Sequence, residues 1–269
     1  MSEWADSHEA EYDVKTADGI RHILWKVDDD RTIAEITAQF KKIPSFYIAD
    51  GHHRSASAYK VGIKRREDNP DFSGSEEFNF FMAVVFPDSD LKIFDYNRVV
   101  KDLNGLTDGE FIEAVKNAGF DVRELEGVSC DCIDEPAACS GILCECAPHF
   151  RHTFTMYLSG KWYELTARPE IILDDVIGSL DVSILQERIL APILGIGDPR
   201  TDKRIDFVGG IRGLSELEKR CKSDMKVAFA VYPIGVSVLM DVADAGLIMP
   251  PKSTWFEPKL GSGLFMHEL

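Results

Sequence analysis

The sequence predicts a mixed α/β fold, because strand-like and helical segments follow one another along its 269 residues. Residues 22–27 and 45–50 are short apolar runs typical of strands, and each precedes a segment with helical spacing. Further along, pairs of apolar runs separated by turn residues are typical of β-hairpins. Hydrophobic residues make up 45% of the chain, which is enough to build a buried core.

In the first half, each expected element follows from a local pattern. Ile33, Ile36 and Phe40 recur at helical spacing behind aspartates that can cap a helix. The runs at 78–86 and 91–100 flank a Pro-Asp-Ser-Asp turn, which predicts a hairpin. The expected elements of this half are a polar lead-in at 1–18, strands at 22–27 and 45–50, helices at 28–42 and 52–67, the hairpin, a helix at 107–118 and a strand at 120–125. The helix at 52–67 has Ala56, Tyr59 and Ile63 on one face.

The second half begins with a cysteine-rich loop and continues with both element types. Ser159 and Gly160 separate two alternating runs, which predicts a second hairpin. The expected elements are this hairpin at 152–158 and 161–166, a helix at 183–194, a buried strand at 227–234, a helix at 236–245 and a C-terminal loop packed by Trp255 and Phe256. The predicted organisation is a lead-in at 1–18, a first part at 19–126, the cysteine-rich loop at 127–152 and a mixed α/β region at 153–269.

Charge and hydropathy exclude several classes of protein. The formal net charge of −16 repels phosphate backbones and anionic membranes, so we expect no general nucleic-acid binding and no membrane association. The acidic N-terminus lacks the pattern of a signal peptide. The longest apolar stretch, residues 227–240, is shorter than a membrane span and contains Pro233 and Gly235. A cytoplasmic protein is therefore expected.

The motif YIADGHHR at residues 47–54 carries the strongest chemical signal. A helix that begins directly after a strand presents its first N–H groups and its positive dipole end, which together attract anions. Gly51 allows a sharp turn and the close approach of a ligand. His52, His53 and Arg54 add side-chain donors, and Arg54 has the planar geometry suited to phosphate oxygens. Asp50 has the chemistry to hold Mg²⁺ or to accept a proton from a substrate hydroxyl.

A structural interpretation of the same residues stays open. Asp50 can be a simple helix cap, and His52 lies in register with the apolar face of the predicted helix, where it can be a core histidine. A cap needs one polar residue, however, and this turn has several. The sequence therefore favours a phosphate site.

The chain resembles a known family through several segments. These are HILWKV, YIADGHHR, DYNRVVKDL, LDVSILQERILAPILGI, RIDFVGG and MPPKSTWFEPKLGSG, from about residue 19 to the C-terminus. They resemble the prokaryotic family called domain of unknown function 1015. The DGHHR turn also resembles the nucleotide-binding motif of ParB-like and sulfiredoxin-like proteins, in particular the free-serine kinases of that fold.

This resemblance implies a ParB/sulfiredoxin-like core around the turn, binding ATP or ADP with Mg²⁺. It gives Asp50 and His53 catalytic roles and assigns Gly51, His52 and Arg54 to the phosphates. Related kinases keep a catalytic glutamate upstream of the motif, and no carboxylate before Asp50 maps onto it. Members of the family usually have a long N-terminal region, and here only the lead-in at 1–18 stands in its place, so the resemblance predicts a truncated or split chain with incomplete catalysis.

Cysteines gather in the predicted loop. Their density in a cytoplasmic protein suggests structural Zn²⁺, although the spacing differs from paired C-x2-C knuckles, and reduced thiols in an inert loop or redox chemistry remain alternatives. The candidate ligands are Cys130, Cys132, Cys139, Cys144, Cys146 and His149. Cys221 lies in a helical segment and is expected to be a small buried hydrophobe.

A second anion site is predicted near the C-terminus, from Lys252, Ser253, Thr254 and Lys259 beside two glycines. The alternative is a solvated loop. Arg98, expected at the end of a strand, is either a phosphate ligand or a surface ion-pair partner.

These observations predict a nucleotide-binding, phosphotransferase-like protein acting on a small hydroxyl substrate such as free serine. Two alternatives remain: a non-catalytic nucleotide-binding or regulatory module, and a metal-stabilised interaction protein.

Overall fold

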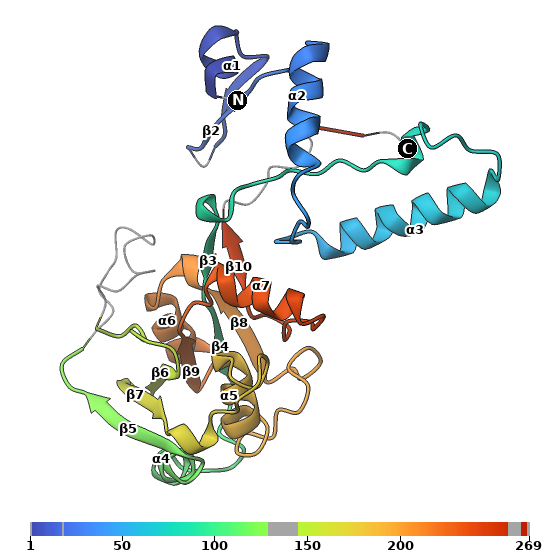
Figure 1. Ribbon diagram of the computed structural model, residues 1–269. Coiled ribbons are helices and arrows are strands. Elements are labelled where there is room, and N and C mark those ends of the chain that lie inside the picture. The colour runs from blue at the N-terminus through green and yellow to red at the C-terminus, as the bar shows by residue number, and fades with distance from the viewer. Residues whose placement is uncertain (1, 18, 129–144, 258–264, 268–269) are drawn as a thin grey trace. The chain divides into compact units, whose positions relative to one another are not determined.

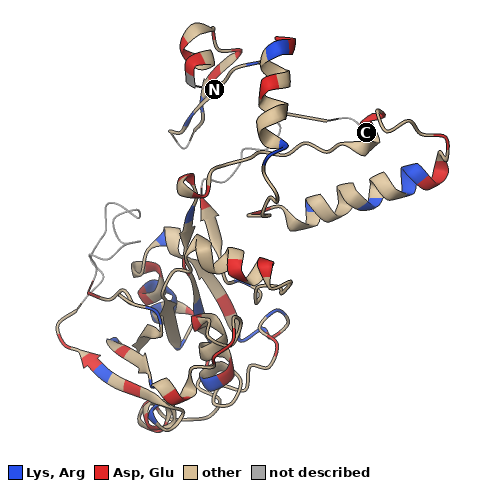
Figure 2. Cartoon of the chain, viewed as in Figure 1, with Lys and Arg blue, Asp and Glu red and all other residues tan. Residues whose placement is uncertain are grey.

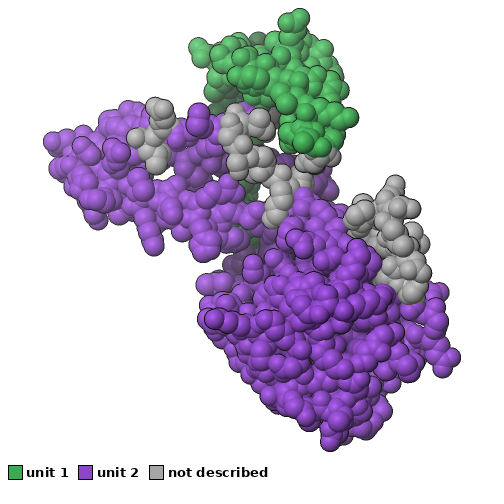
Figure 3. All heavy atoms as spheres, turned by 180° about the vertical axis from the view of Figure 1, so that it is seen from behind, with its two compact units in different colours: residues 1–48 green, residues 49–269 purple. Residues whose placement is uncertain are grey.

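The computed structural model describes residues 2–17, 19–128, 145–257 and 265–267 (Figure 1). Its contacts divide the chain into two units, Met1–Ile48 and Ala49–Leu269, which Figure 3 shows in separate colours. The mixed α/β class expected from the sequence is confirmed. Among the described residues, no helix combines the length and apolar character needed to cross a bilayer.

The first unit contains two helices and a two-stranded antiparallel ribbon. Its elements are α1 (Ser2–Ser7), β1 (Tyr12–Lys15), β2 (Arg21–Leu24) and α2 (Asp30–Phe40). The Asp29 carboxylate caps α2 by accepting a hydrogen bond from the Thr32 N–H at 2.7 Å, as the aspartate run predicted. Residues 2–17, within the predicted polar lead-in, form more regular structure than their pattern predicted, because β1 is held by pairing with β2 and by the exposed Arg21–Asp13 ion pair.

The second unit is built on a six-stranded antiparallel sheet with strand order β5-β7-β6-β9-β4-β8. These strands are β4 (Tyr96–Val100), β5 (Phe120–Leu125), β6 (Thr153–Leu158), β7 (Lys161–Ala167), β8 (Ile205–Gly209) and β9 (Val227–Val231). In the β6–β7 hairpin, Ser159 and Gly160 both have positive φ, as the sequence predicted for a two-residue turn. The edge strand β5 carries both signs of charge (Figure 2). Its side chains form ion pairs with β7, such as that between Glu124 of β5 and Lys161 of β7 at 2.8 Å.

Helices cover both faces of this sheet. The helices of the unit are α3 (His52–Asp68), α4 (Asp108–Asn117), α5 (Asp181–Leu185) with a following π-helical turn (Gln186–Leu190), α6 (Ser215–Ser223) and α7 (Val236–Asp244). Phe111 of α4 and Leu185 of α5 pack with Phe154 and Phe229 on one face. Leu217 of α6 belongs to the apolar cluster on the other face. Alternate residues of the strands therefore fill two separate cores.

Two short strands lie outside the large sheet. β3 (Lys92–Phe94) pairs antiparallel with β10 (Trp255–Glu257), so the predicted C-terminal loop contains a strand, with Phe256 buried. Single 3₁₀ turns complete the unit at Glu77–Asn79, Asp88–Asp90, Pro169–Ile171 and Gly210–Arg212.

Two strand predictions are wrong. Residues 45–50 form no strand, and residues 78–86 contain only the end of a 3₁₀ turn, so the predicted hairpin with 91–100 does not form. Both segments are apolar enough for strands, but neither finds a neighbouring strand among the described residues, and an unpaired strand leaves its backbone groups unsatisfied. The face of α3 expected to be buried is also largely exposed, and the Tyr59 side chain is 68% exposed.

Candidate functional site

The DGHHR motif forms the start of α3, the 17-residue helix at His52–Asp68. Gly51 is the N-cap and has a φ of 80°, a left-handed conformation that favours glycine. The Asp50 carboxylate accepts a hydrogen bond from the Gly51 N–H at 2.8 Å. The first bond within the helix runs from the Ser55 N–H to the Gly51 carbonyl, so the N–H groups of His52, His53 and Arg54 precede the helical ladder.

The charges at this helix start are opposite to those that usually stabilise one. The first turn contains no acidic residue, and the N-cap residue Gly51 has no side chain that could cap the helix. His52, His53 and Arg54 are exposed, and the Arg54 guanidinium folds back against Gly51, where a β-carbon built on the glycine would lie 3.3 Å from Nη2. A cation at the positive end of a helix dipole is destabilising unless an anion accompanies it.

Both structural alternatives for this motif are wrong. Gly51, and not Asp50, occupies the N-cap position. His52 is exposed and takes no part in an apolar core. The predicted strand before the motif is also absent, so the turn connects an extended segment, and not a sheet edge, to the helix.

Arg98 lies inside β4 and is buried, so the expectation of a strand-end surface residue is wrong. Its guanidinium donates hydrogen bonds to the carbonyls of Tyr96 and, at 3.1 Å, Lys252, and it faces the Phe207 ring. Burial lowers the pKa of Arg98 to about 10, which the nearby Asp95 charge opposes in part. Arg98 therefore joins the C-terminal segment to the sheet.

The structure brings Arg98 together with two members of the predicted second anion site. Lys252 has a φ of 58°, and its ammonium group lies 5.4 Å from the centroid of the Tyr96 ring. The buried Ser253 hydroxyl donates a hydrogen bond to the Pro250 carbonyl at 2.6 Å, so its proton is already used within the C-terminal segment. Thr254 is partly buried, and Lys259 lies outside the described residues. An anion site here stays a prediction.

A buried polar pair that the sequence did not single out as functional begins β4. Burial raises the pKa of Asp95 to about 6, while the Asn97 amide and the Arg98 charge act against this rise. The Asn97 side-chain oxygen accepts a hydrogen bond from the Val231 N–H at 3.1 Å. A short Asp-x-Asn pattern before a strand is also common in turns, so the sequence offered no signal that separates the two roles.

The predicted zinc ligands are only partly placed. Cys130, Cys132, Cys139 and Cys144 lie outside the described residues. Cys146 is fully buried in the apolar cluster that includes Tyr157 and Trp162. His149 is partly exposed, and its ring lies edge-on to Phe150. In the described ranges no group of three metal-ligating side chains forms, so zinc stays a prediction.

Zinc content tests this prediction directly. If the loop holds Zn²⁺, elemental analysis of purified protein should give about one equivalent per chain, and a chelator should lower the melting temperature. Cys130→Ser should reduce the bound zinc, whereas Cys221→Ser is the matched control, because Cys221 packs against the core and burial raises the pKa of its thiol to about 12. Protein without zinc, with the same melting curve in chelator, would refute the site.

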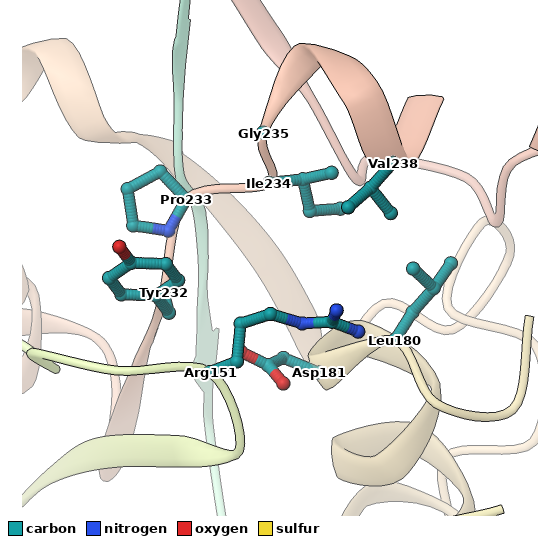
Figure 4. A pocket seen from close by; sticks show the side chains of 8 residues that line it. All are labelled: Arg151, Leu180, Asp181, Tyr232, Pro233, Ile234, Gly235 and Val238. Carbon is teal, nitrogen blue, oxygen red and sulfur yellow. The ribbon is translucent and has the colours of Figure 1, made fainter. Parts of the chain in front are cut away.

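A pocket at the start of α7 was missed in the sequence (Figure 4). Its polar residues are Arg151 and Asp181, and its lining is completed by Leu180, Tyr232, Pro233, Ile234, Gly235 and Val238. Asp181 is 4% exposed, and burial raises the pKa of its carboxyl to about 7. Its Oδ1 accepts a hydrogen bond from the His152 N–H at 2.8 Å. In the sequence Asp181 resembles an ordinary acidic residue at a helix start, and only the packed structure shows its burial.

The chain is a mixed α/β protein in which helix α3 has Gly51 as its N-cap and begins with His52, His53 and Arg54. It belongs to the family described as protein of unknown function (DUF1015), whose model matches residues 1–183. The family resemblance drawn from the motifs is thus confirmed, although the match begins before residue 19 and ends before the segments RIDFVGG and MPPKSTWFEPKLGSG. A search of curated proteins finds no match.

Among solved structures, the chain is similar to free serine kinases. A variant of that kinase in complex with AMP has 16% identity and a TM-score of 0.38, with 86% of this chain and 81% of the other covered. A second variant with AMP has 16% identity and a TM-score of 0.40 over 80% and 70% of the two chains. A third structure, with ADP, has 16% identity and a TM-score of 0.36 over 77% and 66%. The likeness is distant in each case.

Proposed function

We propose that the start of α3 binds the phosphate groups of a nucleotide. The observation that carries this proposal is the set of donors gathered at this turn: three N–H groups before the helical ladder, two exposed histidines, and a guanidinium folded against Gly51. A bound phosphate would offset the repulsion between the Arg54 charge and the positive end of the helix dipole. It would also accept hydrogen bonds from these donors. The left-handed Gly51 has no side chain to obstruct it.

Mg²⁺ fits this proposal through Asp50. Magnesium in nucleotide sites is commonly held by one or two carboxylates together with phosphate oxygens, so a single aspartate beside the phosphates is sufficient. Bound there, the ion would supply charge neutralisation of the phosphates. Asp50 would hold it, and the histidines and Arg54 would orient the phosphate chain.

The chemistry that we propose for a complete site is phosphoryl transfer to a small hydroxyl compound such as free serine. The hydroxyl oxygen forms a bond to the terminal phosphorus of ATP, the bond to the bridging oxygen breaks, and ADP leaves. The hydroxyl proton passes to a carboxylate or an imidazole, and Asp50 and His53 are the candidates.

Calorimetry with ATP, ADP and CTP, each with and without Mg²⁺, tests nucleotide binding. At least one should bind in the micromolar range, and Arg54→Ala should weaken it by about 1.5–3 kcal/mol through loss of charge-assisted hydrogen bonds. Asp50→Asn should preserve binding without metal and remove the effect of Mg²⁺. Arg65→Ala, which removes an exposed arginine from the last turn of the same helix, is the matched control and should bind normally.

The proposal fails if no nucleotide binds, or if Arg54→Ala and Arg65→Ala bind equally well. Phosphorus NMR with serine present then separates the two functional classes. Formation of phosphoserine would establish a kinase, whereas binding without turnover would favour the nucleotide-binding or regulatory module.

A further inference from the structure

We propose that the pocket at the start of α7 binds a small monocarboxylate with a short aliphatic chain. The pocket brings one cationic side chain, one buried carboxyl group and several apolar side chains from three separate segments into one place (Figure 4). It uses no residue of the DGHHR motif, so it stands independently of the nucleotide proposal.

The anionic end of the ligand is matched by Arg151 and by the helix start. In Figure 4 the Arg151 guanidinium and the Asp181 carboxyl group lie on one side of the pocket, with Ile234 and Val238 on the other. Arg151 forms no ion pair with a described residue, and its guanidinium makes one long bond, of 3.4 Å, to the Ser179 carbonyl. Gly235 and Val238 flank the first turn of the nine-residue helix α7, which has no acidic residue there.

The second, independent feature is Asp181. Its side chain is more than nine-tenths buried, and among the described residues only the His152 N–H donates to it, at Oδ1. The other oxygen therefore remains to interact with a pocket ligand. A protonated carboxyl donates a hydrogen bond to a carboxylate, whereas an ionised one repels it.

The remaining lining selects an aliphatic chain over a polar one. Leu180, Ile234 and Val238 present branched side chains, and Pro233 and the Tyr232 ring complete the wall. A polar group placed against these side chains would lose its hydrogen bonds to water without replacement. A short alkyl chain gains from the same burial.

This arrangement makes binding sensitive to pH. The charged or titratable groups that face Asp181 are Arg151 and His152 from the segment before β6 and Tyr232 after β9. Of these groups, Asp181 is the one whose pKa burial raises, to about 7. Loss of the Asp181 proton as the pH rises places a negative charge against the ligand, so affinity falls.

The experiment is an NMR titration of the full chain with butyrate at about pH 6 and about pH 8. We expect saturable shifts for residues around the pocket, with binding at least about tenfold tighter at the lower pH. Acetate, 1-butanol and butylamine should each bind more weakly, because they lack the chain, the anion or the correct charge. Arg151→Gln should weaken butyrate binding by about tenfold or more.

The Asp181→Asn variant tests directly whether ionisation of Asp181 causes the pH dependence of binding. Its amide keeps the acceptor for the His152 N–H and cannot ionise, so this variant should bind butyrate at about pH 8 as tightly as the natural chain does at about pH 6. Arg212→Gln is the matched control, since Arg212 is exposed and lies outside the pocket lining, and it should bind normally. Absent saturation, equal binding of butyrate and butylamine or 1-butanol, normal binding by Arg151→Gln, or an unchanged pH dependence in Asp181→Asn would each overturn the proposal.

Discussion

Replacing Gly209 or Gly210 by alanine is expected to lower the free energy of unfolding of the second unit by about 2–3 kcal/mol, through overpacking. A β-carbon on Gly209 would lie 2.5 Å from Cε3 of Trp255, and one on Gly210 would lie 1.9 Å from Oδ1 of Asp95. Both distances are shorter than side-chain contacts allow. The groups in the way are an indole ring and a buried carboxyl, and neither can swing into solvent.

The same contacts explain why this cost is hard to relieve. The Trp255 ring lies between β8 and the C-terminal segment, with its centroid 5.5 Å from that of Tyr96. Tyr96 is the register partner of Gly209 across the β4–β8 pair. Moving the ring would separate β10 from β3, and moving the strand would break the ladder with β4. Gly209 and Gly210 thus leave the space in which Trp255 and Asp95 pack, and this packing holds the C-terminal segment against the sheet.

Urea unfolding followed by tryptophan fluorescence and by circular dichroism measures this effect. Gly109→Ala is the matched control, because Gly109 lies in α4 with open space around its α-carbon. That variant should be unchanged or more stable by about 0.5–1 kcal/mol, from the higher helix propensity of alanine. Equal midpoints for Gly209→Ala and the natural chain would show that Trp255 does not fill the space above Gly209.

The parts of the fold that depend on neighbouring residues could be predicted from the sequence. Helix α4 begins with a complete capping box between Thr107 and Glu110, and the β6–β7 turn uses Ser159 and Gly160 as expected. Strand β9 followed from its continuous apolar run, which is buried at every position. In each case the local pattern and the final structure agree.

The parts of the fold that depend on residues distant in the sequence could not be predicted. The run at 78–86 has the composition of a strand but lacks a pairing neighbour in the described structure. Strand β8, whose second residue is Asp206, was missed although it pairs along all of β4. The site shows the same division. The exposed donors of the DGHHR motif were predicted from adjacent residues, whereas the pocket around Asp181 needs Arg151 and Val238, which lie far from it in the chain.

Asp181→Asn is expected to raise the free energy of unfolding by about 2–4 kcal/mol at about pH 8 and to change it little at about pH 4. Burial of Asp181 among apolar residues raises the pKa of its carboxyl to about 7 in the folded chain, with the His152 N–H and the Arg151 charge opposing the rise. An aspartate in the unfolded chain loses its proton near pH ~3.9. Between these two values the unfolded state has released a proton that the folded state still holds.

This difference in bound protons decides whether the free energy of unfolding rises or falls with pH. As the pH rises from about 4 to about 7, the folded state loses stability relative to the unfolded one, and above about 7 the full penalty of a buried charge is present. Three pKa units correspond to about 4 kcal/mol, which is the upper bound on that penalty. Asparagine carries no charge at any of these pH values, and its oxygen still accepts from the His152 N–H, so the substitution removes the penalty and keeps the hydrogen bond.

Urea unfolding of both proteins at the two pH values gives the required difference. The titration of Asp95, whose pKa burial raises to about 6, is common to the two proteins and cancels from the comparison. Asp174→Asn, which changes an exposed aspartate, should shift stability by less than about 0.5 kcal/mol at either pH. A gain for Asp181→Asn that is the same at both pH values would mean that Asp181 is not protonated in the folded protein near neutral pH. A gain confined to the higher pH would establish Asp181 as a buried acid that holds its proton until close to neutrality, because the exchange of an oxygen for an NH₂ group has the same effect at both pH values and only the charge of Asp181 changes between them.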